Sequence, residues 1–209
     1  MKKIKNNIKT SIPKEAKDFV KLKNKLPLPT LGNSVTKGGF ILGTNESTYQ
    51  FYIEVGICLT AKTDDNIVGF GILLPDEIIR NGELWKKRKE VNWTIDIKLI
   101  ESKNIAYIEQ LAFIEGNKKL ALILAYNLIN KAFVNGVDYV LTTTVRKPIL
   151  NLAAIPLIRA SGGKLVGNIN ENYPDFNQVN SDIYLIKKEN FYKNIEKLKI
   201  HSFLKKNEI

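Results

Sequence analysis

One ionisable side chain lies inside an apolar part of the sequence. Glu109 is part of Ala106–Phe113, a mostly apolar segment that is typical of a β-strand. If the side chain is buried there, its surroundings raise its pKa toward the range in which a carboxylate works as a general base. If the strand instead alternates between core and solvent, Glu109 is exposed and has no such role. The sequence leaves both readings open.

Other groups that commonly do chemistry are scarce. The chain has one cysteine, Cys58, and one histidine, His201. A single cysteine excludes an internal disulfide and a thiolate cluster, and a lone histidine in a Lys-rich segment argues against a histidine-based triad or metal site. We therefore expect no metal, and no covalent intermediate formed through a Ser-His or Cys-His pair.

The elements that surround Glu109 predict one α/β (α+β) domain over residues 1–209. Ile57–Ala61 and Ile67–Leu74 are apolar runs around a polar turn and predict an antiparallel hairpin, preceded by a helix over Glu46–Val55. In Trp93–Ile100, apolar and polar residues alternate as in a further strand, and a turn joins this segment to the strand Ala106–Phe113.

The second half of the chain alternates between helices and strands. The expected elements are helix 120–133, strand 137–145, helix 151–161, strand 164–169, an irregular loop 171–180, strand 182–186 and a C-terminal helix 190–206. Asn151 is placed to cap the helix over 151–161. This order predicts a mixed, mostly antiparallel central sheet with helices on both faces.

The net charge of +11 is concentrated at the two ends of the sequence. Residues 1–25 carry +7 and residues 187–209 carry +4, whereas residues 26–186 sum to zero. A basic face built into the fold would place its excess in the middle, so this pattern argues against nucleic-acid binding and indicates solvated ends, including a basic tail over residues 1–10. No apolar run approaches the roughly 20 residues of a membrane span, and we expect a cytoplasmic protein.

The segment 106–186 resembles the GNAT superfamily of acyl-CoA-dependent N-acyltransferases. The resemblance rests on five ordered pieces of sequence, and the hairpin 57–74 resembles the strands that precede this core in the family. These pieces are Ala106–Phe113, Asn135-Gly136-Val137, Asn151–Ile155, Gly162–Gly167 and Ser181–Leu185. The resemblance implies a GNAT-like fold and acetyl-CoA, or another acyl-CoA, as co-substrate.

The resemblance also implies where the co-substrate binds. A loop that leads into a helix offers free backbone N–H groups and the positive end of the helix dipole to a pyrophosphate. The matching positions are Gly116, Asn117, Lys118, Lys119, Leu120 and Ala121, where Gly116 and Lys119 replace the family's usual Arg or Gln and Gly. The backbone of Leu111, Ala112 and Phe113 matches the pantetheine-binding strand, and Asn151 matches a further cofactor contact.

The implied reaction is transfer of an acyl group, most simply acetyl, to a primary amine by direct attack in a ternary complex. Glu109 is the candidate base. The family's tyrosine is replaced by Ile158, so Tyr107, Thr143 or Tyr173 is the candidate acid. Two alternatives stay open: a non-catalytic CoA-binding or scaffolding protein of the same fold, and a basic nucleic-acid or ribosome-associated module. The identity of the amine, the length of the acyl group and a homodimer are left open as well.

Overall fold

The computed structural model describes residues 8–13, 15–26, 41, 43–63, 66–114, 116, 118–173 and 177–209. Its strands are β1 (Ile8–Ser11), β2 (Ile57–Thr63), β3 (Asn66–Pro75), β4 (Asn92–Trp93), β5 (Ile105–Phe113), β6 (Tyr139–Lys147), β7 (Lys164–Tyr173) and β8 (Asn177–Lys187). Its helices are α1 (Ala16–Lys23), α2 (Glu46–Val55), α3 (Asp76–Asn81), α4 (Glu83–Lys86), η1 (Lys87–Lys89), α5 (Lys98–Glu101), α6 (Lys118–Val134), α7 (Ile155–Ala160), α8 (Lys188–Glu196) and α9 (His201–Lys206).

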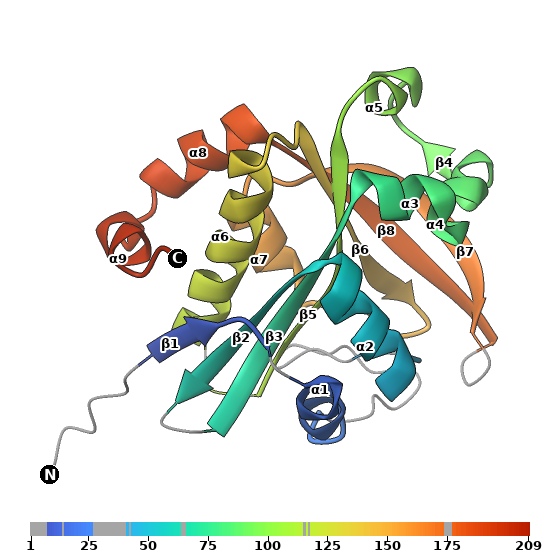
Figure 1. Ribbon diagram of the computed structural model, residues 1–209. Coiled ribbons are helices and arrows are strands. Elements are labelled where there is room, and N and C mark those ends of the chain that lie inside the picture. The colour runs from blue at the N-terminus through green and yellow to red at the C-terminus, as the bar shows by residue number, and fades with distance from the viewer. Residues whose placement is uncertain are drawn as a thin grey trace, which may run out of the picture.

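The strands form one twisted sheet in the order β1-β2-β3-β5-β6-β8-β7-β4 (Figure 1). β5 and β6 are parallel, and every other pair of neighbours in this order is antiparallel. Two antiparallel runs of strands, β1-β2-β3-β5 and β6-β8-β7-β4, thus meet at a single parallel junction. The prediction of a mixed, mostly antiparallel sheet is confirmed.

Helices cover both faces of the sheet (Figure 1). On one face, α6, α8 and α9 pack against β2, β3, β5 and β6 around a core that includes Leu124, Phe133 and Phe191. On the other face, α1, α2 and the segment that contains α3 pack around Phe19, Phe70 and other buried residues. α6 is apolar on nearly all sides because it is enclosed by the sheet and by the C-terminal helices.

The helix α2 is held in place at its start and in its middle. Asn45 caps it, because its side-chain oxygen accepts a hydrogen bond from the Thr48 N–H at 2.9 Å. Tyr49 packs edge-on against Phe19 and Phe70, with ring centroids 5.4 and 5.7 Å away. These contacts fix the helix over the middle of β3 and β5.

The end of the chain is joined to α6 by polar contacts. Asn130 donates to the Glu208 carboxylate at 2.8 Å and accepts from the Tyr192 hydroxyl at 3.0 Å. Asn127 donates to the Asn207 carbonyl at 2.9 Å. The two asparagines are almost fully buried, so these partners replace the water that a buried amide loses.

Several local predictions are wrong. Residues 8–10 belong to β1, which pairs with β2, so residues 1–10 are not a tail throughout. Trp93–Ile100 is not a strand beside β5: only Asn92–Trp93 is extended, at the far edge against β7, and α5 follows. The segment 190–206 forms two helices, α8 and α9, instead of one.

Two further boundaries differ from the sequence prediction. The loop expected over 171–180 is shorter, because β7 continues to Tyr173 and β8 begins at Asn177. The helix expected over 151–161 begins at Ile155, with Pro156 in its first turn where a proline needs no N–H partner. Asn151 therefore does not cap it.

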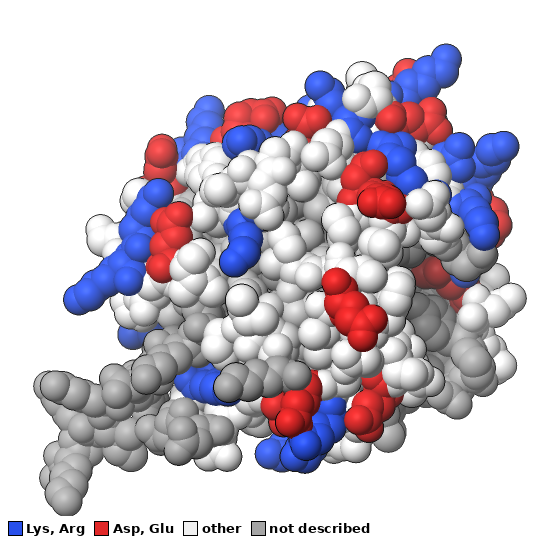
Figure 2. Space-filling view, viewed as in Figure 1, with Lys and Arg blue, Asp and Glu red and all other residues white. Residues whose placement is uncertain are grey.

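On the face shown in Figure 2, basic and acidic side chains are interspersed over the described surface. Within the described ranges, no helix is both long enough and apolar enough to cross a membrane.

Candidate functional site

The parallel junction of the sheet ends partway along its two strands. β5 and β6 pair from Ile105–Tyr139 to Ile108–Thr142. Beyond this point, β5 continues to Phe113 beside β3 only, and β6 continues to Lys147 beside β8 only. Glu109 and Thr143 come directly after the last parallel pair, and we call the place where the two strands separate there the strand opening. Backbone groups on its two edges lack a partner strand, although the Val145 carbonyl accepts a hydrogen bond from the Asn151 N–H at 2.9 Å.

Glu109 is the extra residue of a β-bulge at this opening. In the ladder with β3, Ile72 pairs with Gln110 and Leu73 pairs with Ile108, so Glu109 has no opposite residue. The bulge interrupts the alternation of side chains, and Glu109 and Gln110 both contact α2: Tyr52 donates to Glu109 at 3.2 Å and Tyr49 to Gln110 at 2.9 Å. The sequence alternative of a solvent-facing Glu109 does not hold.

The surroundings of Glu109 favour its protonated form. Burial raises the pKa of its carboxyl, the negative charge of Glu171 raises this pKa further, and the hydrogen bond from Tyr52 lowers it. Glu171, on β7, lies 3.5 Å from the Lys87 ammonium and its side chain is 15 % exposed. The charge of Glu171 thus acts on the Glu109 carboxyl from a neighbouring part of the sheet.

Tyr107 bridges the two strands at the start of the opening. Its hydroxyl lies 2.7 Å from the Thr143 hydroxyl, and either group can donate. Both residues also line a cavity of about 60 Å³ between the sheet and the segment 79–93. Trp85, Trp93 and Glu171 line the same cavity. Candidate acid and candidate base therefore lie on one strand and face the same side of the sheet.

The predicted phosphate loop leads directly into α6. Gly116 has a φ of +94°, a conformation that glycine adopts at little cost, and Asn117 lies outside the described residues. α6 begins at Lys118, and Lys118 and Lys119 are exposed in its first turn, whereas Leu120 is buried in the core. The helix therefore starts with two cations and with the backbone N–H groups of its first turn, a combination that suits an anion.

Polar atoms without partners lie on β6 and in the segment that follows it. The Thr144 hydroxyl and the Asn151 side-chain oxygen are buried and have no hydrogen-bond partner among the residues that the structure describes. Asp182 lies opposite Thr144 on β8. Its Oδ1 atom is 3.6 Å from the Arg146 guanidinium and also has no hydrogen-bond partner among the described residues. Buried polar atoms are nearly always satisfied, so these atoms indicate a ligand or water that completes them.

The strand positions expected to contact pantetheine alternate between the two faces. Leu111 and Phe113 pack on the α6 core, and Ala112 is buried on the α2 side. Gly69 allows this arrangement, because a Cβ there would lie 2.6 Å from the Phe113 ring. Their side chains fill the core, which leaves their backbone as the part that a ligand can reach.

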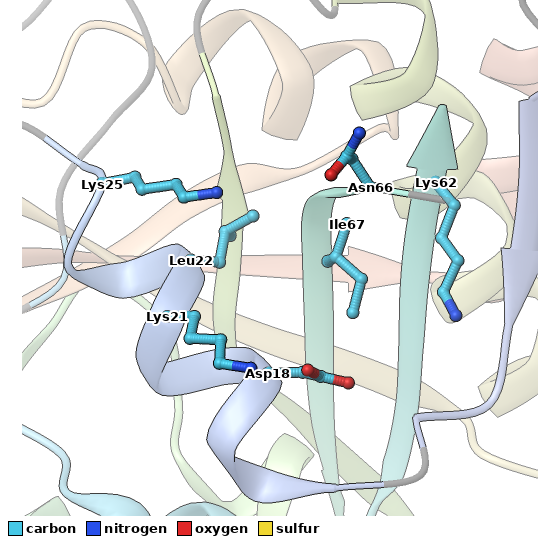
Figure 3. A pocket seen from close by; sticks show the side chains of 7 residues that line it. All are labelled: Asp18, Lys21, Leu22, Lys25, Lys62, Asn66 and Ile67. Atoms are coloured by element: carbon cyan, nitrogen blue, oxygen red, sulfur yellow. The ribbon is translucent and has the colours of Figure 1, made fainter. Parts of the chain in front are cut away.

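A second cavity, of about 250 Å³, lies between α1 and the β2–β3 hairpin. Figure 3 shows its lining side chains, which are Asp18, Lys21, Leu22, Lys25, Lys62, Asn66 and Ile67. It contains none of the residues that the sequence selects, and we do not assign it to the candidate site.

Sequence reasoning missed two contacts of Glu109. Tyr52 lies in the predicted helix Glu46–Val55 and Glu171 in the predicted loop 171–180, and the sequence analysis gave neither of them a role. Both depend on the bulge and on the crossing of distant strands, which leave no local signal in the sequence.

No family model and no curated protein matches this chain, but solved structures do. FeeM, an N-acyl amino acid synthase from uncultured soil microbes, matches with a TM-score of 0.59 and 10% identity over 97% of this chain and 100% of its own. A putative acetyltransferase from Salmonella typhimurium, solved with acetyl-CoA, matches with a TM-score of 0.57 and 12% identity over 87% of this chain and 94% of its own. An N-acetyltransferase from Staphylococcus aureus matches with a TM-score of 0.58 and 12% identity over 87% of this chain and 96% of its own. The chain therefore has the fold of the GNAT N-acyltransferases.

Proposed function

We propose that this protein is an N-acyltransferase that moves an acyl group, most simply acetyl, from acyl-CoA to a primary amine. The observation that carries the proposal is the position of Glu109: a half-buried carboxyl with a raised pKa, placed by a bulge where β5 and β6 separate. A partly buried ionisable group at such a place is typical of acid–base chemistry. The shared fold agrees with this activity.

The donor belongs on the α6 side of the sheet. The first turn of α6, with Lys118 and Lys119, suits the pyrophosphate of CoA, as the solved Salmonella structure with acetyl-CoA makes reasonable for this fold. Thr144 and Asn151 supply buried polar atoms that the amide and hydroxyl groups of a pantetheine arm satisfy. The bound thioester supplies an activated acyl carbon.

The acceptor belongs on the α2 side, where Glu109 faces. Glu109 takes one proton from the ammonium of the acceptor, and the neutral amine nitrogen then bonds to the acyl carbon while the carbon–sulfur bond breaks. The nitrogen loses its second proton as the amide forms, and this proton replaces the one that the acid gives to the sulfur. Tyr107, held by Thr143 at 2.7 Å, is the proposed proton donor to the departing sulfur. The chain thus needs neither a metal nor a covalent intermediate for this transfer.

Glu109→Gln tests the proposal. It keeps the size of the side chain but removes the base, so thiol release at neutral pH falls by about 100-fold or more, whereas acetyl-CoA affinity measured by calorimetry is retained. Glu54→Gln, on the exposed side of α2, is the matched control and keeps the wild-type rate. A Glu109→Gln variant with unchanged rate refutes the role of Glu109. Acetyl-CoA binding by the wild type without thiol release, over a panel of amines, favours a non-catalytic CoA-binding protein.

A further inference from the structure

The cavity of about 60 Å³ beside Tyr107 is lined mainly by hydrocarbon. Its apolar lining includes Ile79, Trp85, Trp93, Leu141, Ile169 and Ile183. The three isoleucines and Leu141 are at most 6% exposed and form a buried floor. Such a site stabilises a bound hydrocarbon group, because it removes that group from water.

The charged side chains at this cavity already have partners of opposite charge. The Lys87 ammonium lies 3.5 Å from the Glu171 carboxylate, and the Arg88 guanidinium lies 3.0 Å from the Glu101 carboxylate. A charged ligand would have to compete with these pairs, whereas a hydrocarbon chain leaves them intact. The described lining therefore favours an uncharged, apolar group.

The cavity begins beside the strand opening. Thr143 directly follows the last parallel pair of β5 and β6, and its hydroxyl lies 2.7 Å from that of Tyr107. Both residues line the cavity, which continues from there over β8 and β7. The Glu109 carboxyl instead contacts Tyr52 of α2, and no described residue of α2 lines the cavity. The candidate base and the cavity thus lie beside different parts of the opening.

The two substrates of the proposed transfer need different places at the opening. The acyl carbon carries the sulfur, which belongs on the α6 side, and receives the amine nitrogen from the side of Glu109. Its remaining carbon substituent is the alkyl part of the acyl group, which must leave the opening in a third direction. The cavity offers this direction, because it starts at Tyr107 and Thr143 and extends away from α2. The occupant that fits is therefore the acyl chain of the donor.

The cavity is larger than the methyl group of an acetyl donor. A water molecule needs roughly 10 to 15 Å³ of comparable space, and a methyl group is of about the same size. An acetyl group would therefore leave most of the volume of about 60 Å³ to water. The cavity is open to the surface, so this comparison sets no maximum length for the chain.

We propose that the donor is an acyl-CoA whose acyl chain is longer than acetyl, and that this chain lies between the tryptophans and the floor of the cavity. The inference rests on the proposed acyl transfer and adds the class of donor. The bonds that form and break are those already described, because the chain beyond the acyl carbon takes no part in them.

Binding of acyl-CoA without an acceptor tests the chain separately from catalysis. Calorimetry compares acetyl-CoA with hexanoyl-CoA, which has four additional CH2 groups. Each buried CH2 group raises the affinity by about fourfold, so the burial of two of them already makes hexanoyl-CoA bind the wild type about tenfold more tightly or better. An affinity for hexanoyl-CoA that is equal to or weaker than that for acetyl-CoA overturns the inference.

Ile169→Phe places a larger side chain in the cavity and shows where the chain binds. The variant loses most of the preference for hexanoyl-CoA and retains the affinity for acetyl-CoA, which also shows that it is folded. Val134→Phe introduces the same side chain on the exposed end of α6 and keeps the wild-type preference. If a folded Ile169→Phe variant keeps the full preference, the chain binds elsewhere and the inference is wrong.

The tryptophans give a second measurement that needs no variant. Trp85 and Trp93 are the only tryptophans of the chain, and both line the cavity. Saturating hexanoyl-CoA changes the tryptophan emission of the wild type, whereas saturating acetyl-CoA leaves it as CoA does. Equal emission with the two thioesters contradicts the placement of the chain.

The alternative occupant is an apolar part of the acceptor. In that case 1-aminohexane changes the emission of the acetyl-CoA complex, while hexanoyl-CoA gains no affinity over acetyl-CoA, and the inference is overturned. The two proposals fail in different ways. Tighter binding of hexanoyl-CoA that Ile169→Phe abolishes, without thiol release over a panel of amines, refutes the acyl transfer and supports the chain site. Thiol release from acetyl-CoA, with no gain in affinity for hexanoyl-CoA, supports the transfer and refutes the class of donor.

Discussion

Replacing Tyr52 with phenylalanine removes one hydrogen bond from the candidate base. The Tyr52 hydroxyl donates to Glu109 at 3.2 Å and stabilises the ionised carboxylate. Burial and Glu171 both act in the opposite direction and are unchanged in the variant. The pKa of Glu109 therefore rises further in Tyr52→Phe, and a higher pH is needed to produce the base.

The size of the effect follows from the strength of that hydrogen bond. A hydrogen bond to a charged group contributes about 1.5–3 kcal/mol, and a length of 3.2 Å places this one near the lower end. About 1.4 kcal/mol corresponds to a tenfold change in an equilibrium constant. On the acidic side of the pH profile, where activity follows the ionised fraction of Glu109, kcat/KM falls by about tenfold. At high pH, where Glu109 is ionised in both proteins, the rates converge.

The assay is the pH profile of kcat/KM, measured by thiol release for the wild type and two variants. Tyr49→Phe is the matched control, because it removes a hydroxyl from the same helix whose partner is the neutral amide of Gln110. Its profile stays at the wild-type position. An acidic limb that does not move in Tyr52→Phe, or that moves equally in Tyr49→Phe, refutes the assignment of Glu109 as the base.

The same raised pKa affects the stability of the wild type. Between the pKa of Glu109 in the unfolded chain and its higher value in the folded protein, the folded state binds more protons. The free energy of unfolding therefore gains from Glu109 below this window and loses that contribution as pH rises through it. Tyr52→Phe makes the loss larger, as urea unfolding at several pH values would measure.

Two further substitutions test other parts of the molecule. Asn151→Leu removes a buried oxygen that has no hydrogen-bond partner among the described residues, so the urea midpoint of unfolding is unchanged or higher. The affinity for acetyl-CoA, measured by calorimetry, falls about tenfold. An unchanged affinity contradicts the placement of the donor beside β6. Asn130→Ala leaves Tyr192 and Glu208 without this partner and lowers the free energy of unfolding by about 1–3 kcal/mol. An unchanged free energy of unfolding in urea denaturation contradicts this prediction.

The sequence was informative where a signal was local. The long apolar run of residues 120–133 and the polar turn between Ala61 and Ile67 predict a helix and a hairpin directly, and the structure has both, as α6 and as β2 and β3. Trp93–Ile100 was predicted wrongly as a strand, because its alternation also suits a short edge strand that leads into a helix. Such segments follow tertiary contacts more than their own propensity.

The candidate site was predictable only in part. Glu109 was selected because a carboxylate in an apolar strand needs an explanation, and the fold provides one. Its partners Tyr52 and Glu171 lie 57 and 62 positions away in the sequence, and only the crossing of α2 and β7 with β5 brings them to it. The bulge itself depends on the register between β3 and β5, which hydrophobic patterning does not specify to one residue.

A crystal structure of the protein with CoA is the most direct test of the whole account. We predict the pyrophosphate at the first turn of α6 beside Lys118 and Lys119, and the pantetheine arm along the edges of β5 and β6 that lack a partner strand. The sulfur should point toward Glu109, with polar atoms of the arm bonded to Thr144 or Asn151. A nucleotide bound elsewhere, or an opening that stays filled by the protein's own side chains at saturating CoA, would contradict the proposed activity and leave only the shared fold.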